Sequence, residues 1–392
     1  MAIFPNTYFE TGSGFMEQLL PLDMALILFA ISFSICGALI VLHPWLVKRL
    51  RGRDDLNSVQ AAHQRCTPRV GGVGVLIAAV VALLFLVPDR GQLSFSVFAL
   101  TLLPVFIAGL AEDLGWRVSP LGRLLAAASS AGLAIVLLQV WIPPLGVAGL
   151  DLAMGFAPFA IFVTILWATG VCHALNLIDG VNGLAGGTGL LIAVGIALVA
   201  TQAGATGFAT IAAALVPALI GFLVFNWPLG RIFLGDAGAY TLGHVLVWLA
   251  IGLAWVNTEI SAIAMSLMFF WPVADTFLAI ARRARAGRPI GAPDRLHFHQ
   301  FVMRALILLS GGRLSKGVAN SATALVLLPM IAAPIAVGVY LWDRPQAALM
   351  AWVMFGLFFT LTYLIGVRTF RSNIWRRVAR RLKNDAQLRR AL

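Results

Sequence analysis

Apolar runs long enough to cross a bilayer recur along almost the whole of this chain, and this recurrence constrains its fold more than any other feature. A transmembrane α-helix needs about 20 mainly apolar residues. Of the 392 residues, 60% are hydrophobic and 11% are charged, whereas soluble domains carry about 25% charged residues. A membrane β-barrel would instead show alternating segments of about ten residues. The sequence therefore predicts an all-α, polytopic integral membrane protein.

We expect about eleven membrane-spanning helices between residues 22 and 366, from the length and hydropathy of the apolar runs. An odd number of spans places the two termini on opposite sides of the membrane. The expected spans are 22–46, 71–88, 96–111, 120–141, 157–175, 184–201, 206–225, 237–256, 260–281, 319–341 and 346–366.

The basic residues orient these helices, because Lys and Arg accumulate in cytoplasmic loops. With the N-terminus outside, only Arg90 and Arg344 of the 28 Lys and Arg residues fall on the outer side. The C-terminus is then cytoplasmic. The net charge of +12 arises mostly from this bias, so it does not indicate a nucleic-acid partner.

The chain divides into a membrane domain, residues 1–366, and a basic tail, residues 367–392. Apolar tail residues recur at four-residue spacing with cations on the other faces, which predicts a helix lying on the anionic inner leaflet. The alternative is that the tail only supplies orientation charge. The cytoplasmic loops are expected at about 47–70, 112–119, 176–183, 226–236 and 282–318.

Four polar, glycine-rich clusters fall on the cytoplasmic side. Charged and amide groups are unfavourable in lipid, so they are expected at a surface, in a cavity or in a functional site. The segment NLIDGVNGLAGG places Asn176, Asp179 and Asn182 between two apolar runs. The other clusters are GLAEDLGWRVSPLGR (109–123), FNWPLGRIFLGDAGAYTLG (225–243) and RPIGAPDRLHFHQ (288–300).

These clusters contain the side chains that a phosphorylated substrate and a hard divalent cation require. Mg²⁺ takes oxygen ligands and is often held by one or two carboxylates plus substrate phosphates. Asp236 in GDAG suits that role. Arg295, His297 and His299 can meet phosphate charge, and arginine can do so with two parallel hydrogen bonds. We therefore predict a phosphate and metal site on the inner face.

In this order and on this topology, NLIDGVNGLAGG, FLGDAGAYTLG and PDRLHFHQ resemble the motifs of the polyprenyl-phosphate N-acetylhexosamine-1-phosphate transferases. The resemblance covers nearly the whole chain. It implies transfer of a sugar 1-phosphate from a UDP-N-acetyl sugar to undecaprenyl phosphate, with release of UMP, as the first membrane step of an O-antigen-like surface glycan. It also implies Mg²⁺ or Mn²⁺ as cofactor and contact with membrane lipid, and it leaves a homodimer open.

The resemblance further implies residue roles. Asp236 matches the metal aspartate, and Asn176 matches an asparagine that reaches the metal or the diphosphate. Glu112 and Asp113 match an acidic pair assigned to the lipid phosphate, and Asp179 is counted with them as catalytic. Contacts to the nucleotide sugar or its phosphates are assigned to Asn182, Arg295, His297, His299 and His63.

The chain departs from the family pattern at four places, one of which is the first inner loop, where VQAAH leads to His63 without the Arg-Lys that is frequent there. Glu112 stands where the acidic pair usually begins with aspartate, His173 stands where asparagine is frequent, and Gln300 replaces a final histidine. A phosphate monoester has a second pKa of about 6 and is largely dianionic at neutral pH. We therefore expect Glu112 and Asp113 to position the nucleophile at least as much as they act as a base, with direct attack preferred over a covalent aspartyl intermediate.

Simpler interpretations stay open for each cluster. NLIDGVNG is also a good turn sequence, Glu112 and Asp113 are also compatible with a solvated helix end, and the histidines with an ordinary loop. Asp275 lies within the span 260–281 and is either structural or next to the substrate cleft.

Two other functions are compatible with this composition: a transporter or lipid flippase, and a degenerate homologue that binds lipid without turnover. Transporters place ionisable residues near the bilayer midplane, whereas the acidic clusters of this chain gather at one surface. The substitutions at Glu112 and Gln300 keep the degenerate homologue open.

Overall fold

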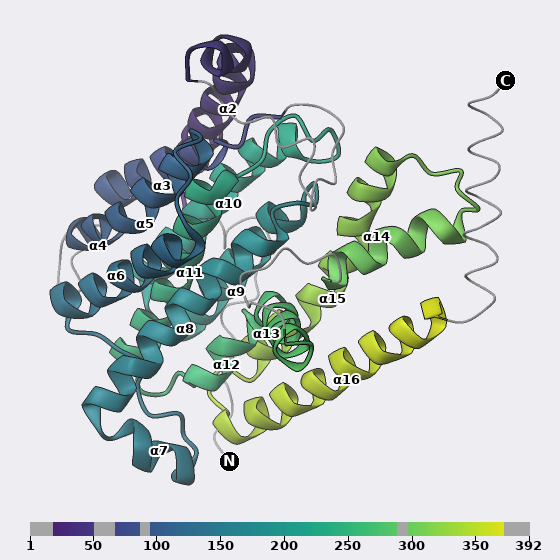
Figure 1. The fold of residues 1–392 in the computed structure, drawn as a ribbon. Helices are drawn as coiled ribbons and strands as arrows, with labels where there is room; N and C mark the ends of the chain where they lie inside the picture. The colour runs from purple at the N-terminus through teal and green to yellow at the C-terminus, as the bar shows by residue number, and fades with distance from the viewer. Residues whose placement is uncertain (1–18, 51–66, 87–94, 288–296, 372–392) are drawn as a thin grey trace, which may run out of the picture.

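The computed structural model describes residues 19–50, 67–86, 95–287 and 297–371 (Figure 1). All regular elements in these ranges are α-helices, which confirms the predicted all-α class. The helices are α2 (Leu22–Leu50), α3 (Gly72–Leu86), α4 (Phe95–Thr101), α5 (Leu103–Asp113), α6 (Pro120–Leu138), α7 (Ala148–Met154), α8 (Ala157–Ile178), α9 (Leu184–Gln202), α10 (Thr206–Asn226), α11 (Gly235–Val256), α12 (Ala262–Leu267), α13 (Phe270–Arg285), α14 (Phe298–Leu309), α15 (Lys316–Tyr340) and α16 (Pro345–Arg371).

Eight helices of the described part are long and apolar enough to cross a membrane. They are α2, α6, α8, α9, α10, α11, α15 and α16. The remaining expected spans coincide with shorter helices: 71–88 with α3, 96–111 with α4 and α5, and 260–281 with α12 and α13. Eight candidate helices confirm a polytopic protein, and the count of about eleven and the orientation of the termini stay predictions.

A proline lies near the break in each of the two divided spans, whereas the prolines inside α2, α10 and α15 leave those helices continuous. Pro104 lies at the first turn of α5, directly after α4 ends. Pro272 lies in the first turn of α13, directly after α12 ends. A proline cannot donate a backbone hydrogen bond and its ring collides with the carbonyl four residues earlier. Each of these two apolar runs is divided into two helices close to its proline.

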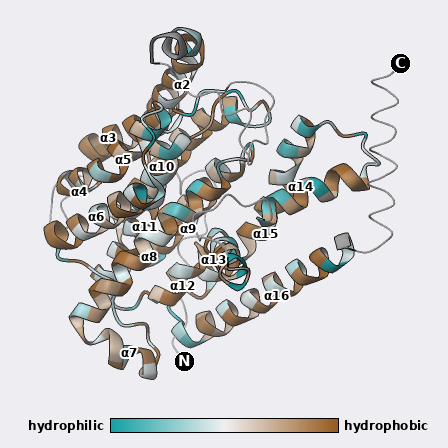
Figure 2. Ribbon diagram, in the orientation of Figure 1, coloured by the Kyte–Doolittle hydropathy of each residue, from teal (hydrophilic) through white to brown (hydrophobic). Residues whose placement is uncertain are grey.

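Helix α11 forms the centre of the bundle (Figure 1). Of its most apolar window, 89% is buried, and it packs against α3, α5, α8 and α9. In α2 and α16 only 17% of the corresponding window is buried. Leu26 and Leu357 are among the exposed apolar side chains of these outer helices, and much of both ribbons has the colour of hydrophobic residues (Figure 2). Apolar outer faces are what a lipid environment favours.

Glycines let the neighbouring helices approach the first turns of α11. A Cβ on Gly72 of α3 would lie 2.0 Å from the Cα of Gly238, and a Cβ on Gly109 of α5 would lie 2.5 Å from the Cα of Ala237. Small residues at helix interfaces permit such close packing in membranes. The C-terminal end of α5 is thereby held beside the N-terminal end of α11.

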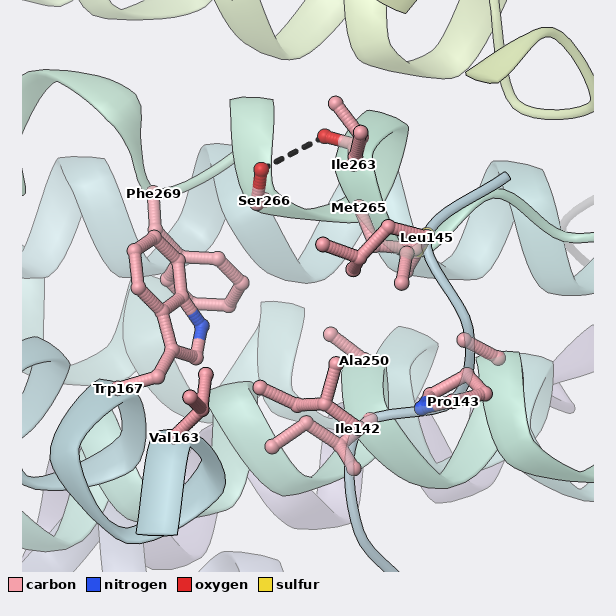
Figure 3. Close-up of a pocket in the computed structure, with 13 residues that line it drawn as sticks. Ile142, Pro143, Leu145, Val163, Trp167, Ala250, Ile263, Met265, Ser266 and Phe269 are labelled. Carbon is pink, nitrogen blue, oxygen red and sulfur yellow. Dashed lines mark hydrogen bonds between the residues drawn. The ribbon is translucent and has the colours of Figure 1, made fainter. Parts of the chain in front are cut away.

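An apolar cavity of about 190 Å³ lies toward the other end of α11 (Figure 3). Trp167, Met265 and Phe269 are among its lining residues, and the Ser266 hydroxyl that lines it donates to the Ile263 carbonyl at 2.7 Å. Its lining also includes Ala250, which is about 21 Å along the helix from Asp236 at 1.5 Å per residue. The cavity is thus apolar and distant from the polar residues at the start of α11.

Candidate active site at the start of α11

Helix α11 begins at a backbone junction that only glycine accommodates. Gly235 has φ +76°, and a Cβ there would lie 1.7 Å from the carbonyl oxygen of Arg69. The two segments are joined by backbone hydrogen bonds: Phe233 N–H donates to Pro68 at 2.9 Å, and Gly71 N–H donates to Phe233 at 2.9 Å. The segment that carries Arg69 is therefore fixed against the start of α11.

Two carboxylates from other helices bind the free N–H groups at this helix start. Asp113, the last residue of α5, accepts from the N–H of Asp236 at 2.9 Å and of Ala237 at 2.8 Å. Asp179, which follows α8, accepts from the N–H of Gly235 at 2.9 Å. Helix N-termini carry unpaired N–H groups and a partial positive charge, so carboxylates are favourable there. Side chains from α5 and α8 thus meet on one turn of α11.

Burial changes the protonation of both carboxylates. It raises the pKa of Asp179 to about 7, against the opposing effects of the Gly235 N–H and the Arg69 charge. It also raises the pKa of Asp113 well above its ordinary value, and the negative charge of Asp236 acts in the same direction. Both groups already accept backbone hydrogen bonds, so their first contribution is to hold the helix start in place.

Asp236 lies in the first turn of α11 and is surrounded by donors. Its Oδ2 accepts a hydrogen bond from Arg123 Nη1, and its Oδ1 accepts from Asn176 Nδ2 at 3.1 Å and lies 3.5 Å from Arg69 Nη2. The Asp236 side chain is 4% exposed, that of Arg123 22% and that of Arg69 43%. Arg69 is the more exposed of the two guanidinium groups, so it presents a cationic group toward solvent, where an anionic ligand can meet it.

Further side chains border this group. The rings of His173 and Tyr240 meet edge to face, with centroids 4.9 Å apart. Glu112 and Tyr240 lie close enough to Arg123 to interact with its charge. The His173 that departs from the family pattern is therefore beside the site.

The structure brings together five residues that the sequence analysis selected: Glu112, Asp113, Asn176, Asp179 and Asp236. Their individual chemical roles stay predictions.

Sequence reasoning did not select Arg69, Arg123 or Tyr240 as site residues. Arg123 closes the same polar cluster that contains the acidic pair, and one residue separates Tyr240 from GDAG. A basic residue in the same polar cluster as the acidic pair was the available signal for Arg123. No comparable pattern singled out Arg69.

Asn182 occupies a structural position. Its backbone N–H donates to Asn320 Oδ1 at 2.7 Å, and its Nδ2 donates to Ser321 Oγ at 3.1 Å. These bonds tie the loop after α8 to helix α15. Its predicted contact with the nucleotide sugar stays a prediction.

The predicted histidines form a second cluster. His297 and His299 are buried and stacked, and each Nδ1 lies 3.4 Å from Asp275 Oδ2. Asp275 is buried and bonded, so it has a definite packing role whether or not it also borders the substrate. His63 and Arg295 lie outside the described residues, as does the tail beyond residue 371.

Among the described residues, no group of three or more His, Cys, Asp and Glu side chains is arranged to hold a metal ion. Mg²⁺ does not need such a group, because substrate phosphates and water complete its ligand shell. Asp236 and Asn176 are in contact through the Asn176 amide nitrogen, and each side chain also carries an oxygen of the kind that this ion prefers.

The sequence of this chain is similar to those of known proteins. The sequence model for glycosyl transferase family 4 matches residues 94–254, which include the acidic pair, NLIDGVNG and GDAG. A probable undecaprenyl-phosphate N-acetylglucosaminyl 1-phosphate transferase of Bacillus subtilis is 28% identical over 72% of this chain and 79% of its own length. Undecaprenyl-phosphate alpha-N-acetylglucosaminyl 1-phosphate transferases of Salmonella typhi and Escherichia coli K12 are each 27% identical, over 86% and 85% of this chain and 91% and 89% of their own lengths. The predicted family is confirmed.

Proposed function

Because this chain is a member of glycosyl transferase family 4, we propose that it transfers an N-acetylhexosamine 1-phosphate from a UDP-sugar to undecaprenyl phosphate and releases UMP. The names of the relatives make UDP-N-acetylglucosamine the first donor to test. One observation carries the proposal for this chain. Asp236 lies between Arg69, Arg123 and Asn176 on a helix turn that Asp113 and Asp179 hold in place.

The reaction is a phosphoryl transfer. An oxygen of the lipid phosphate attacks the phosphorus that bears the sugar, a new phosphorus–oxygen bond forms, and the bond to the bridging oxygen breaks. UMP leaves with that oxygen. Such reactions depend mainly on positioning and on electrostatic stabilisation of the transferring group. The lipid phosphate is already largely dianionic, with a second pKa of about 6, so it needs little deprotonation.

The two arginines provide that stabilisation. Arg123 is mostly buried and Arg69 is more exposed, so they can meet phosphate oxygens at different depths. Guanidinium groups bind phosphate with two parallel hydrogen bonds and stay charged at all physiological pH values. We infer that both arginines bind the diphosphate of the donor and the charge that develops as UMP leaves.

Asp236 and Asn176 would hold Mg²⁺ or Mn²⁺ together with the diphosphate. The ion neutralises phosphate charge as a Lewis acid when it is bound. Asp236 contributes the charged oxygen, and Asp113 and Asp179 keep the turn that carries it in one position. Activity that persists at full rate after removal of divalent cations with EDTA would contradict this assignment.

We propose that this site opens to the cytoplasm from the bacterial inner membrane, with about eleven spans and a cytoplasmic C-terminus. The asymmetry of Lys and Arg supports this orientation. A cytoplasmic site meets both the water-soluble donor and the lipid headgroup at the same boundary. Cysteine labelling from each side of sealed vesicles tests this orientation. A cysteine introduced at position 113 should be labelled from the cytoplasmic side, and one at position 344 from the opposite side.

The decisive assay uses the purified full chain in nanodiscs with undecaprenyl phosphate, Mg²⁺ and a panel of UDP-N-acetyl sugars. Release of UMP together with a lipid-linked diphosphosugar is the expected result. No UMP with any donor, from protein that is folded by circular dichroism, would reject the transferase function.

A further inference from the structure

Asp275 organises the start of helix α14 from a different helix, α13. Its Oδ1 accepts a hydrogen bond from the N–H of Phe298 at 2.9 Å. The residue before this helix, His297, makes no capping hydrogen bond with its own side chain. Asp275 therefore supplies from α13 the acceptor that the helix start needs.

The other oxygen of Asp275 faces two imidazoles. Oδ2 lies 3.4 Å from Nδ1 of His297 and 3.4 Å from Nδ1 of His299. The two rings are nearly parallel, with centroids 5.4 Å apart and an interplanar angle of 12°. All three side chains are at most 4% exposed. One carboxylate thus sets the direction of two stacked rings.

Phe298 anchors the pair from the opposite side. Its ring lies 5.0 Å from that of Trp271 and 5.2 Å from that of Phe359. The aromatic contacts and the backbone hydrogen bond fix the residue between the two histidines. The rings therefore have little freedom to turn away from Asp275.

Both ring nitrogens of His297 are buried and make no hydrogen bond within the part of the chain that the structure describes. Nδ1 has the ion-pair contact of 3.4 Å with Asp275, and Nε2 has no contact of that kind. An unsatisfied buried polar group costs about 1–3 kcal/mol. With Nδ1 directed at the carboxylate, Nε2 lies on the other side of the ring, available to a polar ligand.

We propose that Asp275 is a positioning residue, which holds His297 and His299 in one orientation toward the phosphate oxygens of the nucleotide-sugar donor. The inference rests on the proposed function for the identity of the ligand. Carboxylates that orient histidines in this way fix which ring nitrogen faces the ligand. Asp275 acts through the two rings and needs no contact with the donor itself.

The variant Asp275→Asn separates orientation from packing. Asparagine keeps an oxygen that can accept from Phe298 N–H, so the start of α14 is retained. Its amide nitrogen is a donor where Oδ2 was an acceptor, so the two Nδ1 atoms lose their common partner. A comparison of this variant with wild type therefore tests the orientation of the two imidazole rings, because the hydrogen bond at the start of α14 is kept in both.

The experiment measures KM for UDP-N-acetylglucosamine and for undecaprenyl phosphate in nanodiscs. Loss of an orienting partner typically costs 10–100-fold, so we expect the donor KM of Asp275→Asn to rise about tenfold, with the acceptor KM within about twofold. Combined with His297→Gln and His299→Gln, Asp275→Asn should add almost nothing, because the groups act as one unit. Equal changes in both KM values, or a full additional effect in the combined variant, would overturn the inference.

Asp151→Asn is the matched control, since Asp151 also accepts a backbone N–H, that of Leu145, but faces no histidine. Its two KM values should equal those of wild type. If Asp275→Asn does not fold, His297→Gln alone must show the donor-specific increase, and its absence would reject the proposal. The two proposals fail differently: wild type without UMP release rejects the transferase function, whereas an active wild type with an unchanged Asp275→Asn rejects only this inference.

Discussion

Asp236 and Asp275 are both buried aspartates at the start of a helix, but they stand in opposite relations to it. Asp236 belongs to the first turn of α11, and carboxylates from α5 and α8 bind the N–H groups around it. Asp275 belongs to α13 and itself binds the N–H of Phe298 at the start of α14. Asp236 is thus part of the helix start that it belongs to, whereas Asp275 binds the start of a different helix.

Their partners differ in the same way. Asp236 has arginines, which are charged at every physiological pH, and one of them is 43% exposed. Asp275 has two histidines, which are charged only when protonated, and both are buried. Under the proposed function, the first cluster would offer permanently charged groups to a phosphate ligand, and the second would hold two rings in one direction.

The largest effect is expected at Asp236. Asp236→Asn keeps the shape but removes the charge that the two arginines and the proposed metal share, so kcat should fall by at least about 100-fold. UMP release measures it, and membrane insertion should be normal. A variant with near-normal turnover would show that Asp236 is no more than a helix residue, and the contrast with Asp275 would disappear.

A smaller effect is expected at Arg123. Arg123→Lys keeps one positive charge but loses the planar fork that binds two oxygens at once, so kcat/KM for the donor should fall about tenfold or more. Arg344→Lys, at the pair with Asp343 that lies 3.6 Å apart and is exposed, is the control and should be neutral. Equal rates for both variants would mean that charge alone suffices at the site.

The packing that brings the first cluster together can be tested at Gly109. A Cβ there would lie 2.5 Å from the Cα of Ala237, so Gly109→Ala should force α5 away from α11. Overpacking of this kind costs about 1–3 kcal/mol of stability. The unfolding temperature in detergent and the rate of UMP release should both decrease.

Gly132 of α6 provides the control, because a Cβ at that position meets nothing within 4 Å. Gly132→Ala should leave the unfolding temperature and the activity unchanged. If both alanine variants behave alike, the close approach of α5 to α11 is not what positions Asp113.

The smallest expected effect is a pH dependence of stability. Burial raises the pKa of Asp179 from 3.8 to about 7, so over this window the folded protein keeps a proton that the unfolded chain releases. Stability should therefore be greatest below the lower value and should decrease as the pH rises through about 7. Asp179→Asn should flatten the slope of unfolding temperature against pH, and a wild type without this slope would contradict the assignment.

The sequence by itself determined the class, the family and most of the residues near Asp236. Span length and hydropathy are properties of consecutive residues, and motifs such as NLIDGVNG and GDAG are short, so both can be read without coordinates. The breaks near Pro104 and Pro272 were not expected from the sequence, because prolines also lie inside the unbroken helices α2, α10 and α15.

Only the tertiary structure decided which residues meet. Asp113 and Ala237 are 124 positions apart, and Arg123 and Asp236 are 113 apart, so no periodicity could pair them. Glycine contacts between α3, α5 and α11 create the approach that makes these bonds possible. Asp275 is the clearest case: as a mid-span aspartate it had no evident partner, and its two histidines reach it from another helix because Phe298 packs among aromatic rings.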